Sequence, residues 1–356
     1  MTMSNLYVDL HVIQTVPPSC LNRDDTGSPK TAVYGGVRRA RVSSQAWKHA
    51  MREMFKKYFD EQDLGVRTKK IVELVAKEIK ILKPLVEDSE ISELAEKIIN
   101  KANVKTADGE AKALFFMSIQ QAKNLAELAV SDEFDKKTAQ DALNKGHGID
   151  IALFGRMVAD DPSLNADASA QVAHAISTHK VDNEFDYFTA ADDRAPEDNA
   201  GAGMIGTVEY NSSTLYRYAT VAVHELFGQL ANDSDATAKA VVEFVRAFVL
   251  SMPSGKMNTF ANRTPPDAVY IVIRNDMPVN LAGAFETPVR SGSGYVGASL
   301  KALGGYAENV YGSFALKPEK SYVVTANNEF NALGNAISLD VLLENIEADI
   351  KGALLL

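Results

Sequence analysis

The alternation of side chains near the start of the chain restricts the fold more than any other feature. From residue 6 to residue 13, apolar side chains occupy every even position and fall on one face of an extended segment. A period of two predicts a β-strand with one buried face. Pro17 and Pro18 end this strand, and residues 19–36, rich in Gly, Pro, Asp and Ser, predict a long loop. Loops of this length inside compact domains are usually functional.

An amphipathic helix is predicted after this loop. Ser43 and Ser44 are suitable for capping its start. Apolar residues then recur at helical spacing, and Lys48, Arg52 and Lys56 stand four apart beside them as a basic ridge. A strand, a loop and a helix in this order predict the opening of an α+β domain of the RRM-like, or ferredoxin-like, kind.

The rest of the chain divides by its patterns. Residues 61–165 predict a largely helical insertion, 166–178 a short Ala-rich return helix, and 179–213 a β-hairpin that projects from the domain. Residues 214–356 return to the α+β domain begun by residues 1–60. They predict a continuation of strand 207–223, a helix at 236–252, a strand at 269–274 and a final helix at 338–355.

Composition favours a soluble protein without disulfides. The chain has 356 residues, of which 46% are hydrophobic and 24% charged, and a single cysteine, Cys20, which cannot form an intramolecular disulfide. No apolar run is long enough to span a membrane, and the first residues do not resemble a secretory signal. We therefore expect a cytoplasmic protein with no membrane partner.

Charge is unevenly distributed along the chain. The formal net charge is −10, yet residues 20–57 contain nine Lys or Arg against three Asp or Glu. Such polarity allows one face to hold a polyanion while the other faces repel it. Within this segment, residues 35–45 combine two glycines, three arginines and the start of the helix, a combination suited to contacting phosphates. Taken alone, the tract is equally compatible with a structural cluster of arginines.

Enzymatic alternatives have weaker support in the sequence. Residues 201–206 match the spacing of a dinucleotide fingerprint, but an acidic loop precedes them and a strand follows, which argues against that site. The pairs Asp24-Asp25 and Asp192-Asp193 could hold a divalent metal in an RNase, although adjacent Asp residues more often form turns. The histidines and serines show no catalytic or metal-binding spacing. We predict no catalytic residue, metal or cofactor, and we keep a metal-dependent RNase and a stand-alone RRM-like RNA-binding module as alternatives.

Several motifs resemble one protein family in the same order. They are residues 18–25, the tract 35–45, and residues 148–157, 173–179, 186–190 and 216–219. Together they resemble the CasC (Cse4-like) family, the crRNA-binding backbone subunit of the type I-E CRISPR Cascade complex. The resemblance extends over most of the chain but carries little signal between about residues 64 and 145.

The resemblance implies a shape and a set of partners. It implies an RRM-like palm, a helical finger domain and a β-hairpin thumb. Copies of such a subunit polymerise as a filament along crRNA, flip nucleotides out at regular intervals and leave the other bases to pair with target DNA in antiviral defence. The implied partners are crRNA, target DNA through the guide heteroduplex, neighbouring copies of the chain, and the large, small and crRNA-capping subunits of Cascade.

The predicted RNA-binding residues come mainly from this resemblance. It places the phosphate path of the palm at Arg23, Lys30, Arg38, Arg41, Ser43, Gln45, Lys48 and His49. It places a wedge between bases at Met157, and thumb contacts at Phe188, Thr189, Ile205 and Thr207. Arg39 and Arg52 join the set because they belong to the basic tract and ridge. Val37 and His49 depart from the family pattern, which has Lys and Arg there, so these two contacts are expected to be weaker.

Overall fold

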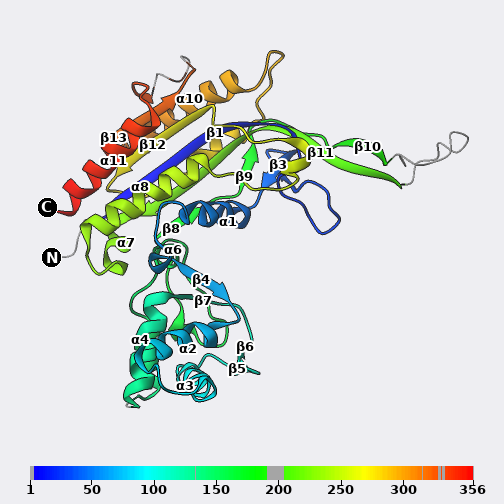
Figure 1. Cartoon of the computed structure of the whole chain (residues 1–356). Coiled ribbons are helices and arrows are strands. Elements are labelled where there is room, and N and C mark those ends of the chain that lie inside the picture. Colours follow the sequence, from blue (N-terminus) through cyan, green and yellow to red (C-terminus); the bar gives the residue numbers. More distant parts are fainter. Residues whose placement is uncertain are drawn as a thin grey trace, which may run out of the picture.

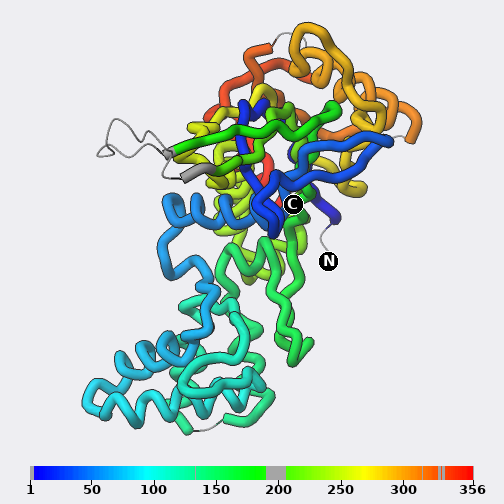
Figure 2. Tube along the Cα trace, turned by 90° about the vertical axis from the view of Figure 1, so that its right-hand side faces the viewer, coloured from blue at the N-terminus to red at the C-terminus, as the bar shows by residue number. Residues whose placement is uncertain are grey.

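The computed structural model describes residues 4–132, 134–190, 204–314, 316–327, 330 and 333–355. It confirms an α+β fold (Figure 1). A large antiparallel sheet with helices on both faces forms the body, a mostly helical lobe hangs from one side, and a long hairpin extends from one end. Figure 2 shows the lobe below the body, joined to it by the chain segments that follow α1 and precede β8.

The sheet of the body is antiparallel where its strands pair. Its main path runs β13-β12-β1-β11-β9-β3-β2, and β8 and β10 also pair with β11. The strands are β1 (Tyr7–Ser19), β2 (Thr31–Tyr34), β3 (Val37–Val42), β8 (Ala170–Val172), β9 (Ala175–Ser177), β10 (Glu184–Ala190), β11 (Met204–Ala222), β12 (Ala268–Arg274) and β13 (Lys320–Thr325).

Helices cover one face of the sheet and enclose the main core. Leu10 on β1, Trp47 on α1, Phe244 on α8 and Ile346 on α11 are all buried in this core. The helices of this part are α1 (Ser44–Phe55), α7 (Val223–Gln229), α8 (Ser234–Leu250), the short α9 (Met257–Phe260) and α11 (Leu339–Leu354). The helices predicted after Ser43, at 236–252 and at 338–355 are confirmed.

The opposite face of the sheet is also buried, which corrects the expectation of a half-buried first strand. Asp9, His11 and Ile13 are at most 1% exposed. They are covered by α10 (Val296–Phe314) and the 3-10 helix η3 (Leu281–Phe285), which the sequence patterns did not predict. The first strand is therefore a central strand with two buried faces.

The lobe between residues 61 and 165 has a core of its own. It is mostly helical but also contains two small antiparallel sheets, β4-β7 and β5-β6. Its elements are η1 (Glu61–Asp63), β4 (Gly65–Thr68), α2 (Ile71–Leu82), α3 (Asp88–Lys101), β5 (Thr106–Ala107), β6 (Glu110–Ala111), β7 (Phe115–Ser118), α4 (Ile119–Ser131), α5 (Lys136–Leu143), α6 (Ile149–Phe154) and η2 (Pro162–Leu164).

The predicted return helix at 166–178 is wrong. The segment forms the strands β8 and β9, both of which pair with β11, and β9 also pairs with β3. Its small residues Ala170 and Ala175 are buried against the core. Pairing with a long central strand outweighs the modest helical preference of alanine, because propensity is a weak constraint compared with tertiary contacts.

The predicted loop at 19–36 ends in regular structure. Residues Thr31–Tyr34 form β2, which pairs with β3 through a two-residue turn at Gly35 and Gly36. Both glycines have positive φ angles, +58° and +75°, as such a turn requires. A Cβ at Gly35 would also lie 1.6 Å from the Glu286 carbonyl oxygen. The turn and its packing thus account for the two glycines that the sequence analysis assigned to phosphate contact.

Candidate nucleic-acid interface

The start of α1 is fixed by side chains from three separate segments. Ser43 Oγ accepts a hydrogen bond from Ala46 N at 3.2 Å, and Ser43 N donates to Asn22 Oδ1 at 2.9 Å. The backbone N–H of Ser44 donates to His174 Nδ1 at 3.1 Å. Ser43 is therefore a buried helix cap, so its predicted role in RNA binding reduces to positioning the helix.

Two predicted cations lie beside this helix start. Arg41 N donates to Lys30 O at 2.9 Å, which places the two residues on adjacent backbone segments. The pKa of His174 is lowered, first by burial and then by the charges of Arg41 and Lys30. The neutral imidazole can therefore accept the bond from Ser44, while the surrounding potential stays positive. His174 was not among the predicted site residues, because its segment was expected to be helical.

Arg23 and Arg38 are exposed in the same region of the chain. Arg38 lies on β3, and Arg23 forms an isolated bridge with Pro29 in the preceding loop. Gln45 and His49 are exposed on α1. These four side chains, with Lys30 and Arg41, form the accessible part of the predicted phosphate path.

Arg39 does not belong to this surface, which corrects its predicted role. Its side chain is fully buried, and the guanidinium donates to the carbonyl oxygens of Tyr34, Ser177 and Phe285 at 3.1, 2.9 and 2.7 Å. The three acceptors come from separate parts of the chain. Arg39 therefore fastens the β2-β3 hairpin to the body and cannot contact a phosphate without leaving these bonds.

Arg52 is partly exposed and forms an ion pair with the lobe. Its Nε lies 2.9 Å from Asp150 Oδ2, and Asp150 Oδ1 accepts from Gly65 N at 2.7 Å. Its guanidinium carbon lies 4.4 Å from the centre of the Phe116 ring. Burial raises the pKa of Asp150 and Arg52 opposes this shift. The pair joins α1 to the lobe, so Arg52 has a structural role, and its contact with RNA stays a prediction.

Lys48 faces the lobe from the same side of α1. Its Nζ lies 5.4 Å from the centre of the Phe154 ring. The pKa of Lys48 is lowered, mainly by burial and then by Arg67 on β4. Arg67 was missed because the segment between residues 64 and 145 gave little signal. Lys48 and Arg67 therefore add a second group of cations where α1 meets the lobe.

Met157 is 87% exposed, which suits a side chain that contacts a ligand. It follows α6 and lines a cavity of about 410 Å³ in the lobe, together with Arg67, Lys105 and Lys112. An apolar side chain surrounded by cations can meet the bases of a nucleic acid while its neighbours meet phosphates.

The predicted thumb residues lie on opposite faces of the hairpin. Thr189 pairs with Ile205 and Tyr187 with Thr207, whereas Phe188 pairs with Gly206. Directly paired residues share a face and neighbours alternate, so Phe188 points away from the Thr189 and Thr207 side. The side chain of Ile205 lies outside the described residues. A nucleotide on one face of the hairpin therefore cannot contact both Phe188 and the pair Thr189 and Thr207.

Two exposed aromatic side chains on this hairpin were missed. Phe185 and Tyr187 are 66% and 63% exposed and share the face of Thr189 and Thr207. The hairpin is also continuous with the body, because β11 is a single strand of 19 residues whose other half pairs with β1. The predicted boundary between residues 213 and 214 falls inside this strand.

The acidic pairs do not form a metal site in the described residues. Asp24 Oδ1 accepts from Thr26 N, Thr26 Oγ1 and Ser28 N at 2.9, 2.7 and 3.0 Å. These bonds, with that of Thr26 first, lower the pKa of Asp24. Asp192 and Asp193 lie outside the described residues. In the part of the chain that is described, no three His, Cys, Asp or Glu side chains gather as metal ligands.

The residues that match a dinucleotide fingerprint are followed by a strand and not by a helix. Residues 204–206 begin β11, which pairs antiparallel with β10, and residues 201–203 are outside the described ranges. A helix N-terminus is what such a fingerprint needs for pyrophosphate.

Over the described residues, none of the helices is both long and apolar enough to cross a bilayer.

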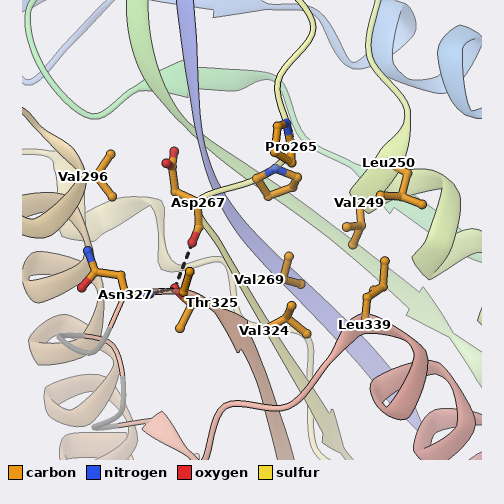
Figure 3. Close-up of a pocket in the computed structure, with 12 residues that line it drawn as sticks. Val249, Leu250, Pro265, Asp267, Val269, Val296, Val324, Thr325, Asn327 and Leu339 are labelled. Atoms are coloured by element: carbon orange, nitrogen blue, oxygen red, sulfur yellow. Dashed lines mark hydrogen bonds between the residues drawn. The ribbon is translucent and has the colours of Figure 1, made fainter.

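A separate cavity of about 700 Å³ lies at the ends of β12 and β13 (Figure 3). Its lining is mostly apolar, with Leu250, Val269 and Val324 among the residues drawn. Thr325 Oγ1 donates to the Asp267 carbonyl at 2.9 Å at its edge. No Lys or Arg lines it, so it is not part of the cationic surface.

Comparison with known proteins defines the class of this fold. The CT1975-like protein family matches residues 8–347. The chain belongs to the CT1975-like protein family. No curated protein is significantly similar to it in sequence.

Two solved structures resemble the whole chain. One is a chain of a "CRISPR RNA-guided surveillance complex, pre-nicking", with 31% identity and a TM-score of 0.82, covering 97% of this chain and 100% of that one. Another is a chain of a "CRISPR RNA-guided surveillance complex", with 30% identity and a TM-score of 0.65, covering 96% of this chain and 99% of that one. The similarity includes the lobe and the hairpin as well as the sheet.

Proposed function

We propose that this chain is the crRNA-coating backbone subunit of a Cascade-type CRISPR surveillance complex, of the type I-E CasC kind. The single observation that carries the proposal is the exposed cationic surface around α1, beside a hairpin continuous with the central sheet. Full-length similarity to chains of RNA-guided surveillance complexes supports it. In this proposal the sheet body is an RRM-like palm, the lobe is the finger and the hairpin is the thumb.

The chemistry favours binding that does not depend on RNA sequence. Lys30, Arg38 and Arg41 are suited to phosphates, and Phe185 and Tyr187 offer faces on which bases can stack. Sequence would then be read by pairing of the guide with target DNA, while the protein holds the RNA backbone.

The subunit is proposed to act as a cytoplasmic, non-catalytic filament. Repetition along RNA needs a contact between unlike surfaces of neighbouring copies, so that the assembly does not close. A hairpin that extends rigidly from the body can reach the next copy and turn one nucleotide out at each step. The proposed partners are crRNA, target DNA, further copies of this chain and the other Cascade subunits.

Copurification with RNA tests this proposal. The chain is expressed with a CRISPR array and its sister subunits, and the RNA retained after purification is sized. The variant Arg38→Glu/Arg41→Glu/Lys48→Gln should lose the RNA and the assembly. The control Lys77→Glu/Lys301→Glu/Lys317→Glu changes exposed lysines elsewhere and should retain both. Normal assembly of the first variant on RNA would show that the assigned surface is wrong.

A metal-dependent RNase is the enzymatic alternative. Purified protein is incubated with labelled RNA and Mg²⁺ or Mn²⁺, and cleavage is followed on a gel. The backbone proposal expects intact RNA. Turnover that disappears in Asp24→Asn or in Asp192→Asn/Asp193→Asn would favour the nuclease instead.

A stand-alone RNA-binding module is the third alternative. Light scattering with RNAs of increasing length separates it from a filament subunit. The filament proposal expects a mass that grows with RNA length, whereas a single module gives one fixed stoichiometry for each site.

A further inference from the structure

A groove lies beside α1, on the side of the helix that faces away from the lobe. It is a cavity of about 360 Å³ between α1 and the segment 251–263, which follows α8. His49 and Lys57 line it from α1, and Arg263 lines it from the opposite wall. Leu21 lines this groove and also a small cavity that contains Lys30 and Arg41. The groove therefore continues the cationic surface at the start of α1.

The charges in this groove are available to an anion. Lys57 and Arg263 are exposed, and neither forms an ion pair within the described residues. Arg263 Nη2 donates to Leu250 O at 3.2 Å, which anchors the guanidinium at the end of α8. Glu53 also lines the groove, but Lys56 Nζ binds its carboxylate oxygens at 2.8 and 2.9 Å.

The wall that carries Arg263 is closely packed against the body. A Cβ at Gly255 would lie 2.1 Å from the Leu21 carbonyl oxygen, so the segment touches residue 21 without space for a side chain. Asn262 Nδ2 donates to Gly255 O at 3.4 Å. Ser251 is 2% exposed and lines the groove, and its Oγ has no hydrogen-bond partner among the described residues. A buried hydroxyl without a partner costs free energy that a ligand oxygen would recover.

We propose that this groove binds a backbone phosphate of the same RNA, with Arg263 and Lys57 supplying the charge and Ser251 a hydroxyl donor. This rests on the proposed function, and it makes the RNA path longer than the resemblance implied. Ser44 to Lys57 spans about 20 Å at 1.5 Å per residue, enough for several phosphates in succession. Cations at both ends of α1 then fix the direction of the RNA along the helix.

Salt dependence of RNA affinity tests the groove. Affinity of the full chain for a labelled single-stranded RNA is measured by anisotropy at several salt concentrations. Each lost phosphate contact should lower the slope of log affinity against log salt by about 0.7. Lys57→Glu/Arg263→Glu should therefore lower the slope by about 0.7, and Arg263→Ala should lower it by less, because Lys57 still holds the phosphate. Arg263→Lys should keep most of the parent slope, because the charge remains.

The controls separate this inference from the proposed function. Lys301→Glu/Lys317→Glu carries the same change in net charge away from α1 and should keep the parent slope.

If Arg38→Glu/Arg41→Glu loses RNA while Lys57→Glu/Arg263→Glu keeps the parent slope, the groove is wrong and the proposed function stands. If the parent chain binds no RNA, both fall. If the groove variant keeps the parent slope but loses a partner subunit, the groove holds protein and the inference is overturned. Should the double variant unfold, the slope of Arg263→Ala decides.

Discussion

Phe188 lies over Gly206 on the hairpin, and a Cβ added at Gly206 would stand 2.4 Å from Phe188 Cζ. The glycine thus provides the space in which the aromatic ring rests across the strand pair. This contact fixes the ring on the face opposite Thr189 and Thr207. The two faces of the hairpin can then meet different partners, for instance RNA on one side and a neighbouring copy on the other.

Replacing Gly206 tests the position of this ring. Gly206→Ala should displace Phe188 and weaken assembly on RNA, because the new methyl group occupies the ring's place. The melting temperature should change little, since the hairpin extends beyond the core. Nuclease protection of the bound RNA is the measurement, and loss of its regular spacing is expected. Gly228→Ala is the matched control, because a Cβ there meets nothing within 4 Å. Unchanged protection in Gly206→Ala would show that the ring position is irrelevant to the RNA.

Arg38 and Arg39 are neighbours with opposite expected phenotypes. Arg39→Ala removes the donor from three carbonyl groups, those of Ser177 and Phe285 buried and that of Tyr34 part-buried, and should lower the free energy of unfolding by about 3 kcal/mol. Arg38 is exposed, so Arg38→Ala should leave stability within about 0.5 kcal/mol and weaken RNA binding. Urea unfolding and RNA anisotropy on both variants measure the two effects. A reversed pattern would mean that Arg39 leaves its carbonyl partners to bind RNA.

The part of the fold set by strong local patterns could be predicted from the sequence. The apolar stripe of α1, the capping serine and the alternation of β1 all specify their elements. The helix α10 was missed because its glycines at 297, 304, 305 and 312 lower helical propensity and its apolar residues do not form a single stripe. Without α10, the second face of β1 was expected to be exposed.

The candidate site could be predicted only as a region. Charge density selected the segment around α1 but could not distinguish Arg38 from Arg39, because no strand was predicted at residues 37–42, where β3 alternates their side chains. Likewise, Arg52 was assigned to RNA because its partner Asp150 is distant in sequence. The role of an arginine depends on which acceptors tertiary structure brings to it.

The turn glycines Gly35 and Gly36 differ in what surrounds them. Both have positive φ, so an alanine at either costs about 1 to 2 kcal/mol in backbone strain. At Gly35 the added Cβ would also clash with the Glu286 carbonyl, whereas at Gly36 it meets nothing within 4 Å. Gly35→Ala should therefore destabilise the protein more than Gly36→Ala in urea unfolding. Equal losses of unfolding free energy in the two variants would indicate that residue 286 moves away from the added Cβ without cost.

His11 should make stability depend on pH. His11 lies on β1, and its imidazole is buried on the face of the sheet that α10 covers. Burial, followed by the charge of Arg274, lowers its pKa to about 3. The rings of Tyr216, Tyr218 and Tyr270 pack against the imidazole, and Tyr216 Oη lies 2.9 Å from His11 Nδ1. In the unfolded chain a histidine has a pKa of about 6.5. Between about pH 6.5 and pH 3, the unfolded state therefore binds a proton that the folded state does not.

The sign of this effect follows from the depressed pKa. The contribution is fully present above the unfolded pKa and is lost as pH falls, by about 1.4 kcal/mol per pH unit below about 6.5. His147, whose pKa is lowered to about 4 by burial and Arg156, adds a similar loss over a narrower range. Urea unfolding of His11→Phe from pH 7 to pH 5 should show a shallower dependence than the parent, even though the lost bond to Tyr216 lowers its stability at pH 7. His49→Phe, an exposed position on α1, should keep the parent dependence. A His11→Phe profile parallel to the parent would mean that His11 takes up its proton in the folded state, in spite of its burial.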